Sequence, residues 1–374
     1  MAGMATDVTL AEFPNDDLMC RWFRPLVAKG TAWCAPNLET KLAFLRTGEV
    51  ELPLTVNEGE WENSWICSPY THYISYAREE IDRATGPVTG WMGATMLGAF
   101  GAWFRNADFN RVVMVNNWLH STNPWPRWEA EDLPAVLEAL VERWPCHAIL
   151  FRSLNARESG PLLKALPRAG ASLVPSRQVW WYEPDSELVA KSHEFRKDAR
   201  LLHRGDLEIV PHENILERDF PVLTELYDQL YLRKYSRHNP QFTEAWFRHL
   251  HAENLARFTA LRTEEGRFVG VEACSELHGV LTSPIVGYDL ERPQSLGLYR
   301  RLAVMPILEA RRRGRPLNLS AGVGRYKALR GGEAVMEYLA VYDRHLPVGR
   351  RLPWRCIEQL SSRVLAPYVI RHGL

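Results

Sequence analysis

Apolar and polar residues follow two different periods along this chain, and the change of period predicts the order of its elements. Within residues 289–343, apolar side chains recur every three to four positions from Leu298 to Leu308, which is typical of one helical face. Ser295 is the expected N-cap of this helix, and Gly314, after three arginines, marks its expected end. A short strand, a Gly-rich turn and a final strand are expected to follow.

Before this helix the pattern changes to strands. Residues 257–262, 267–277 and 280–289 are predicted strands, joined by hairpins at Glu264-Glu265-Gly266 and His278-Gly279. Because side chains alternate across a strand, Glu272 and Glu276 fall opposite the apolar face of the middle segment. We therefore expect both carboxylates to point toward solvent or a cleft.

The first half of the chain has weaker but similar signals. Residues 1–60 look irregular apart from a strand at 50–56. A polar helix rich in Arg and Lys is expected over residues 191–208. Between them we expect helices over 90–103, from about Asp132, and over 160–169, and strands at 111–115, 148–151 and 174–182.

Residues 61–76 form a segment dense in aromatic and small polar side chains. Such a mixture suits a cleft wall that binds a substrate, and it equally suits a core loop in which large rings fill space. The substrate-binding candidates in this segment are Trp65, Tyr70, His72 and Tyr73.

Composition narrows the class of protein. The chain has 374 residues with zero formal net charge, which indicates about two domains and argues against a protein built mainly to bind DNA. Six widely spaced cysteines are expected to be reduced and mostly buried, and no metal-ligand motif is visible. No segment is apolar enough to span a membrane and no secretory signal is visible, so we expect a cytoplasmic protein.

One ordered series of motifs resembles a known group. Gly287-Tyr288-Asp289, Ser295-Leu296-Gly297, Gly322-Val323-Gly324 and Tyr326-Lys327 occur in the order found in GNAT-type acyltransferases of the FemABX and BioF2-like group. The resemblance implies a mixed α/β (α+β) fold with two tandem GNAT-like lobes. We expect an N-terminal lobe over 1–185, a connecting helix over 186–210 and an acyltransferase lobe over 211–374.

The resemblance also implies amide-forming acyl transfer without a covalent enzyme intermediate. Lys327 would stabilise negative charge on the reacting carbonyl, with Tyr326 beside it and Glu272 as the base. Glu276 and Asp289 are the reserve candidates for the base and are also expected to contact the substrate. The donor phosphates would lie at Arg292, Gln294, Ser295, Leu296 and Gly297, although the spacing of this segment departs from the common GNAT loop.

Three functions remain open from the sequence. The first is transfer from acyl-CoA or an acyl-carrier protein to a small amine bound between the lobes, with no tightly bound cofactor. The second is a Fem-type ligase that uses aminoacyl-tRNA, for which the polar helix at 191–208 would contact phosphates. The third is a GNAT-like binding module without catalysis.

Overall fold

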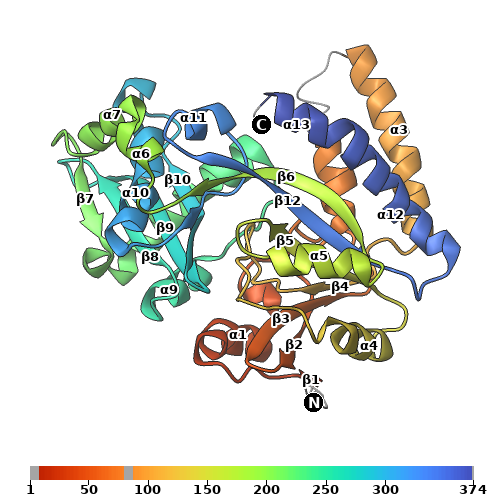
Figure 1. Ribbon diagram of the computed structural model, residues 1–374. Coiled ribbons are helices and arrows are strands. Elements are labelled where there is room, and N and C mark those ends of the chain that lie inside the picture. The colour runs from red at the N-terminus through yellow and green to blue at the C-terminus, as the bar shows by residue number, and fades with distance from the viewer. Residues whose placement is uncertain (1–7, 80–86, 373–374) are drawn as a thin grey trace. The chain divides into compact units, whose positions relative to one another are not determined.

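The computed structural model describes residues 8–79 and 87–372. The chain divides into two compact units. Unit 1 holds Met1–Ser176, His238–Pro240 and Tyr338–Pro367, and unit 2 holds Arg177–Arg237, Gln241–Glu337 and Tyr368–Leu374. Along the chain, β6 (Ser172–Tyr182) and β12 (Glu333–Tyr342) each contribute residues to both units (Figure 1). The predicted boundary near residue 185 stays a prediction.

Unit 1 contains four antiparallel strands and a fifth that runs parallel to the fourth. The order is β1-β2-β3-β4-β5. β4 and β5 keep their register from Val112 opposite Ala148 to Val115 opposite Phe151. The strands are β1 (Val8–Ala11), β2 (Lys41–Thr47), β3 (Val50–Asn57), β4 (Val112–Val115) and β5 (Ala148–Asn155).

Helices cover both faces of the unit 1 strands, because alternate strand residues enter two separate cores. Val113 and Ile149 pack with residues of α4 (Leu133–Arg143) and α5 (Gly160–Arg168). Met114 and Leu150 pack with residues of α3 (Pro87–Asn106) and α12 (Val348–Leu360). The remaining elements here are α1 (Asp17–Lys29), η1 (Thr31–Trp33), η2 (Thr71–Ser75), η7 (Ser361–Leu365) and α13 (Ala366–His372), whose last residues belong to unit 2.

Unit 2 repeats this strand plan. Four antiparallel strands, in the order β7-β8-β9-β10, are followed by β11, which runs parallel to β10 and antiparallel to β6. The strands are β7 (Glu208–Pro211), β8 (Arg257–Arg262), β9 (Phe268–Leu277), β10 (Val280–Tyr288) and β11 (Leu317–Asn318).

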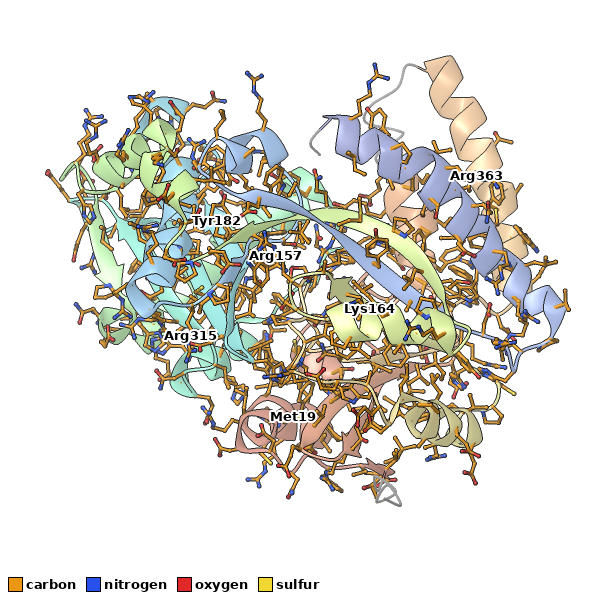
Figure 2. All side chains as sticks on the ribbon, viewed as in Figure 1. Met19, Arg157, Lys164, Tyr182, Arg315 and Arg363 are labelled. Atoms are coloured by element: carbon orange, nitrogen blue, oxygen red, sulfur yellow. The ribbon has the colours of Figure 1, made fainter. Side chains whose placement is uncertain are left out.

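Two sets of helices pack against the unit 2 strands. α7 (His193–Leu202) and α10 (Leu298–Arg313) share a core with Tyr182, which Figure 2 labels. On the opposite face, α8 (Phe220–Asp228) crosses β10 so closely that a Cβ on Gly287 would lie 2.4 Å from the Tyr227 nitrogen. The other elements are α6 (Glu187–Lys191), η3 (His212–Asn214), η4 (Glu217–Asp219), η5 (Gln229–Tyr235), α9 (Glu244–Ala252), η6 (Gln294–Leu296) and α11 (Gly324–Ala328).

Most predicted elements are confirmed, and three local predictions are wrong. Residues 1–60 are not irregular, since β1, α1 and β2 lie there. The polar helix over 191–208 is interrupted at Ser192, whose side chain caps α7 by accepting from the Phe195 N–H. Ser295 does not cap α10, because residues 294–296 form a 3-10 turn and Gly297 is the N-cap.

Candidate active site

In unit 2, β10 and β11 separate shortly after they meet. The two strands pair at only two positions, the second being Thr282 with Asn318. β11 ends there, whereas β10 continues to Tyr288. The chain after β11 follows β6 instead, because the Leu319 N–H donates to Trp180 O (2.9 Å). Residues 283–288 of β10 therefore have β9 on one side and, in the described part of the chain, no strand on the other; we call this side the open edge.

A bulge decides which main-chain groups the open edge presents. The register of β10 against β9 shifts within residues 282–285. After the bulge, the Asp289 N–H donates to Val269 O (3.0 Å). Hydrogen-bonded and non-hydrogen-bonded pairs alternate in an antiparallel ladder, so the main-chain groups of Val286 and Tyr288 point away from β9. Each can pair with an extended ligand that carries amides.

The first turn of α10 follows the open edge along the chain. Gly297 has φ 63° and ψ 33°, and α10 has no side-chain cap. Four N–H groups at the start of a helix lack intrahelical partners, and they lie at the positive end of the helix dipole. Among residues 8–79 and 87–372, no group accepts a hydrogen bond from the main-chain N–H of Leu298, Tyr299 or Arg300. Such an opening binds phosphate or another anion.

Lys327 is buried in α11, with only 7% of its surface exposed. Its ammonium donates to the carbonyl oxygens of Leu319 (2.6 Å), Ser320 (3.3 Å) and Ala321 (2.8 Å). Burial, and then the nearby Arg177, lowers the Lys327 pKa to about 7, whereas three carbonyl oxygens favour the charged form. An ammonium has three donors, so all of them are directed at the segment before α11.

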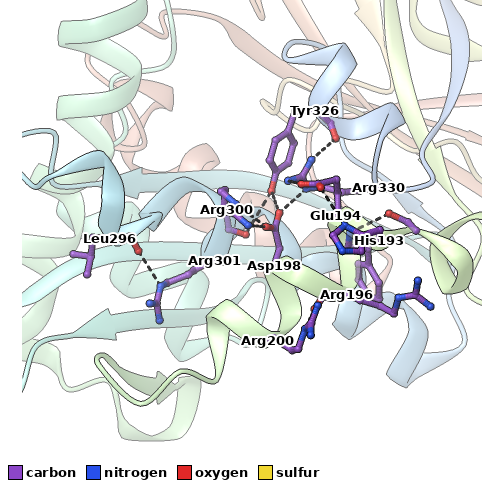
Figure 3. A network of polar contacts seen from close by, with 12 residues as sticks. His193, Glu194, Arg196, Asp198, Arg200, Leu296, Arg300, Arg301, Tyr326 and Arg330 are labelled. Carbon is purple, nitrogen blue, oxygen red and sulfur yellow. Dashed lines mark hydrogen bonds and ion pairs between the residues drawn. The ribbon is translucent and has the colours of Figure 1, made fainter.

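Tyr326 belongs to a polar network around Asp198, which is fully buried (Figure 3). The Tyr326 hydroxyl donates to Asp198 Oδ2 (2.8 Å), and the Nε groups of Arg300 and Arg330 donate to the same carboxylate, each at 2.6 Å. Burial raises the pKa of Tyr326, so its phenol stays protonated. Asp198 therefore ties α7, the first turn of α10 and α11 together.

Glu272 is buried in β9, with 2% of its surface exposed. It lies on the face covered by α10, because a Cβ on Gly270 would meet Leu302 at 3.2 Å. Its carboxylate accepts a hydrogen bond from Ser283 Oγ (2.7 Å), and burial raises its pKa to about 8. Ser283 is half-buried and belongs to the bulge, so the link from Glu272 to the open edge runs through this hydroxyl.

The other predicted donor residues lie in the turn between β10 and α10. Arg292 pairs with Asp289 (3.2 Å), so these two charges offset each other. Gln294 and Ser295 are exposed and Leu296 is half-buried. Gly297 is required by its positive φ and by Leu201, whose side chain would lie 2.7 Å from a Cβ there. The structure thus brings the predicted donor residues together in the turn over residues 289–297, which we call the donor loop.

Glu276 lies apart from them. Its carboxylate pairs with Arg313 (3.0 Å) at the end of α10 and with Arg315 (3.2 Å), which Figure 2 labels. Because α10 is a 16-residue helix, its two ends lie roughly 24 Å apart. Glu276 is therefore distant from the donor loop.

The aromatic candidates lie in unit 1. Tyr70 is buried against Trp61, with ring centroids 5.1 Å apart, and the rings of His72 and Tyr73 are 4.6 Å apart. Trp65 donates from Nε1 to Asn239 Oδ1 (2.9 Å). Burial raises the pKa of the Tyr73 hydroxyl. These contacts belong to the packing of unit 1, and their substrate role stays a prediction.

Three contributors were not predicted as site residues: Asp198, Ser283 and Tyr299. Asp198 stood in a polar helix where any carboxylate looks solvated, and only packing shows that it is buried. Ser283 precedes Pro284 inside an apolar strand, which is a local signal of a bulge. Tyr299 follows the donor loop directly, and its ring lies 5.0 Å from that of Tyr326.

No group of three or more His, Cys, Asp or Glu side chains in the described part of the chain is arranged to hold a metal ion. In the same part of the chain, every helix is too short or too polar to cross a bilayer.

Comparisons with known proteins concern the fold. No known family matches the sequence, and no curated protein does. Among solved structures, FemX is 10% identical to this chain. The match covers 66% of this chain and 84% of the FemX chain, with a TM-score of 0.50. L-PGS from Bacillus licheniformis is 16% identical to this chain, and the match covers 61% of this chain and 77% of the L-PGS chain, with a TM-score of 0.45. A tandem GNAT protein from the clavulanic acid biosynthesis pathway is 14% identical to this chain, and the match covers 90% of this chain and 98% of that protein's chain, with a TM-score of 0.39.

At these identities the comparisons address the fold alone, and FemX is similar to this chain in fold. In unit 2, antiparallel strands lead into the α10 helix and a parallel return strand, as the sequence predicted. The strand plan of unit 1 repeats that of unit 2. The chain has the mixed α/β fold, with two units of the same strand plan, that its sequence predicted.

Proposed function

We propose that this protein is an N-acyltransferase that transfers an acyl group from a thioester, carried by CoA or a carrier protein, to the amine of a small metabolite or amino acid. The main support is the open edge of β10, which leads directly into an uncapped helix start. The neutral amine attacks the thioester carbonyl carbon, so that a C–N bond forms and the C–S bond breaks. The amine loses a proton, the thiolate gains one, and the products are an amide and a thiol.

The donor would lie along unit 2 in an extended form. Amides of a pantetheine arm would pair with Val286 and Tyr288, as an added strand pairs with a sheet edge. The phosphates at the other end would accept hydrogen bonds from Leu298, Tyr299 and Arg300. This arrangement places the thioester near the bulge at Ser283, where β10 and β11 separate. Holding the reactants in this way supplies much of the rate enhancement of such a transfer.

Glu272 is the proposed proton acceptor, acting through Ser283. The amine proton would pass to Ser283 Oγ as the hydroxyl proton moves to the carboxylate 2.7 Å away. A pKa of about 8 makes Glu272 a stronger base than an ordinary carboxylate, at the cost of a smaller ionised fraction at neutral pH.

Donor binding tests the proposal directly. We expect calorimetry to show that CoA binds at least about tenfold more tightly than pantetheine, which lacks the diphosphate. Incubation with a panel of acyl-CoA and acyl-carrier donors and small amines should then give an amide detectable by mass spectrometry. Equal affinity for CoA and pantetheine, or failure of every thioester to bind, would contradict the proposed donor site.

An aminoacyl-tRNA donor is the second candidate, and α7 is the observation that favours it. Arg196, Lys197 and Arg200 are exposed, and no carboxylate among the residues that the structure describes pairs with them. Binding of a polynucleotide weakens steeply with salt. If aminoacyl-tRNA is the donor, its affinity should fall at least tenfold between 50 and 200 mM salt, and the triple change of these residues to Gln should reduce that dependence.

A further inference from the structure

We infer that the main-chain N–H of Ala321, with that of Gly322 beside it, donates to the carbonyl oxygen of the acyl donor, and that Lys327 is the positioning residue that turns this segment toward the open edge. The inference rests on the proposed acyl transfer. It assigns to the backbone the charge stabilisation that the sequence suggested for the ammonium itself.

The direction of the Ala321 N–H follows from the geometry of the peptide bond. Ser320 O accepts from the Trp180 N–H of β6 (3.2 Å) and from the Lys327 ammonium (3.3 Å). In a trans peptide the N–H points opposite to the carbonyl, and the chain has no cis bonds among its described residues. The Ala321 N–H, which shares this peptide with Ser320 O, therefore points away from β6, to the side on which β10 separates from β11.

The peptide between Ala321 and Gly322 is also oriented by Lys327. Ala321 O accepts from Lys327 (2.8 Å), so the Gly322 N–H also points away from the ammonium. Ala321 is half-buried and Gly322 is exposed, and neither N–H has an acceptor within the described ranges. The Ser320 N–H differs, since it donates to Asn318 Oδ1 (3.0 Å). Two adjacent donors are thus left for a ligand.

Lys327 is held firmly enough to impose this conformation. Its carbonyl accepts from the Tyr182 hydroxyl (3.1 Å) and from the N–H groups of Arg330 (3.0 Å) and Gly332 (3.1 Å). The segment that its ammonium binds includes Ser320 with φ 55°, a conformation that non-glycine residues rarely adopt. Three hydrogen bonds to one buried cation offset that strain and keep the three carbonyl oxygens on one side.

Backbone donors suit the chemistry. As the amine adds to the thioester, the carbonyl oxygen gains negative charge, and a fixed N–H directed at it stabilises that charge more than the neutral ground state. When the intermediate collapses, the C=O bond re-forms and the C–S bond breaks. An ammonium whose donors already bind three carbonyl oxygens contributes through the conformation that it maintains.

Replacing a single amide by an ester tests the assignment. Lactic acid incorporated at position 321 of the full chain replaces the N–H by an oxygen and keeps the methyl side chain, while Ser320 O becomes a weaker acceptor. We expect kcat to fall by about 10²-fold or more while the affinity for CoA changes less than about threefold. The same ester at Ala135, an exposed residue in the first turn of α4 in unit 1, is the matched control and should stay within about threefold of the unaltered protein in both quantities.

The outcomes separate this inference from the proposed function. If the ester variant binds CoA and turns over at an undiminished rate, the Ala321 N–H has no catalytic role and the inference is wrong, although acyl transfer stands. If the unaltered protein transfers no acyl group from any thioester, the proposed function itself fails. Circular dichroism and thermal unfolding of the Ala321 ester, compared with those of the Ala135 ester and the unaltered protein, ensure that a loss of rate is not a loss of folding.

Discussion

The two units share a strand plan but treat the parallel strand pair differently. In unit 1, β4 and β5 pair at four successive positions, whereas in unit 2, β10 and β11 pair at two and then separate at a bulge. The same topology is thus closed in one unit and open in the other. Ligand access in this fold depends on where the strand pair stops, because a paired strand has no main-chain groups left to offer.

The segments that follow β10 and β4 also differ in how many of their main-chain groups remain available to a ligand. After β10 the chain enters the donor loop and the uncapped start of α10. After β4 it enters a buried loop in which several polar groups hydrogen-bond within the protein. Asn117 donates to Thr55 Oγ1 (2.9 Å), and the Trp118 N–H donates to Asn123 Oδ1 (2.9 Å). Unit 2 is therefore the unit in which we expect catalysis.

The largest expected effect comes from the buried lysine of unit 2. Lys327→Met keeps an unbranched side chain that is one atom shorter and removes its three donors, so kcat should fall by about 10²-fold or more. Lys164→Met in α5 of unit 1, which is exposed and labelled in Figure 2, is the matched control and should leave kcat unchanged. Equal rates for the two variants would remove the distinction between the units.

A smaller effect is expected where α8 crosses β10. Gly287→Ala places a methyl group 2.4 Å from a backbone nitrogen and 2.6 Å from the Leu226 carbonyl oxygen, so the free energy of unfolding should fall by about 2 kcal/mol. Gly349→Ala in α12 of unit 1 has open space around it and should be neutral or slightly stabilising. Urea titration measures both. A neutral Gly287→Ala would mean that β10 does not depend on this close approach.

The donor loop should respond to added negative charge. Ser295→Asp places a carboxylate beside the N–H groups that we assign to the donor phosphates, so the Kd for CoA should rise about tenfold with kcat little changed. Ser186→Asp, before the uncapped start of α6 in the same unit, is the control and should leave donor binding unchanged. An unaltered Kd in Ser295→Asp would place the phosphates elsewhere.

The smallest effect concerns pH. Burial raises the Glu272 pKa from 4.5 to about 8, so between these values the folded protein binds more protons at this site than the unfolded chain does. Its unfolding free energy should therefore fall with rising pH in that window, by about 1 kcal/mol per pH unit from this group. Glu272→Gln removes that contribution. Urea titrations at pH 5.5 and 6.5 should show a weaker pH dependence in the variant, and identical dependence would contradict the burial of an ionisable group there.

Local pattern predicted most of the elements of unit 2. Gly314 was expected to end α10 and does so with φ 63°, because a helix end needs a left-handed residue. The start of the same helix was misplaced, since Ser295 looked like a cap and sequence alone does not distinguish a cap from a 3-10 turn. In unit 1, β1, α1 and β2 were missed because their periods are short and broken by polar residues.

The chemistry of the candidate site was predicted only in part. The Tyr326-Lys327 pair was recognisable as a motif, yet its sequence does not show whether the ammonium meets a ligand or the protein's own carbonyl oxygens. Glu272 was expected to face solvent or a cleft, since strand alternation separates two faces without saying which one a helix covers. The packing of α10 over that face buries the carboxylate and raises its pKa.

Periodicity, glycines and caps are properties of a few neighbouring residues, and for that reason the sequence by itself determined the α/β class, most strands and helices, and the position of the turn between β10 and α10. The end of the β10–β11 pairing, the burial of Asp198 and the direction of the Ala321 N–H depend on residues far apart in the chain. Only the tertiary structure decided these features, because each is fixed by packing and hydrogen bonds between several elements.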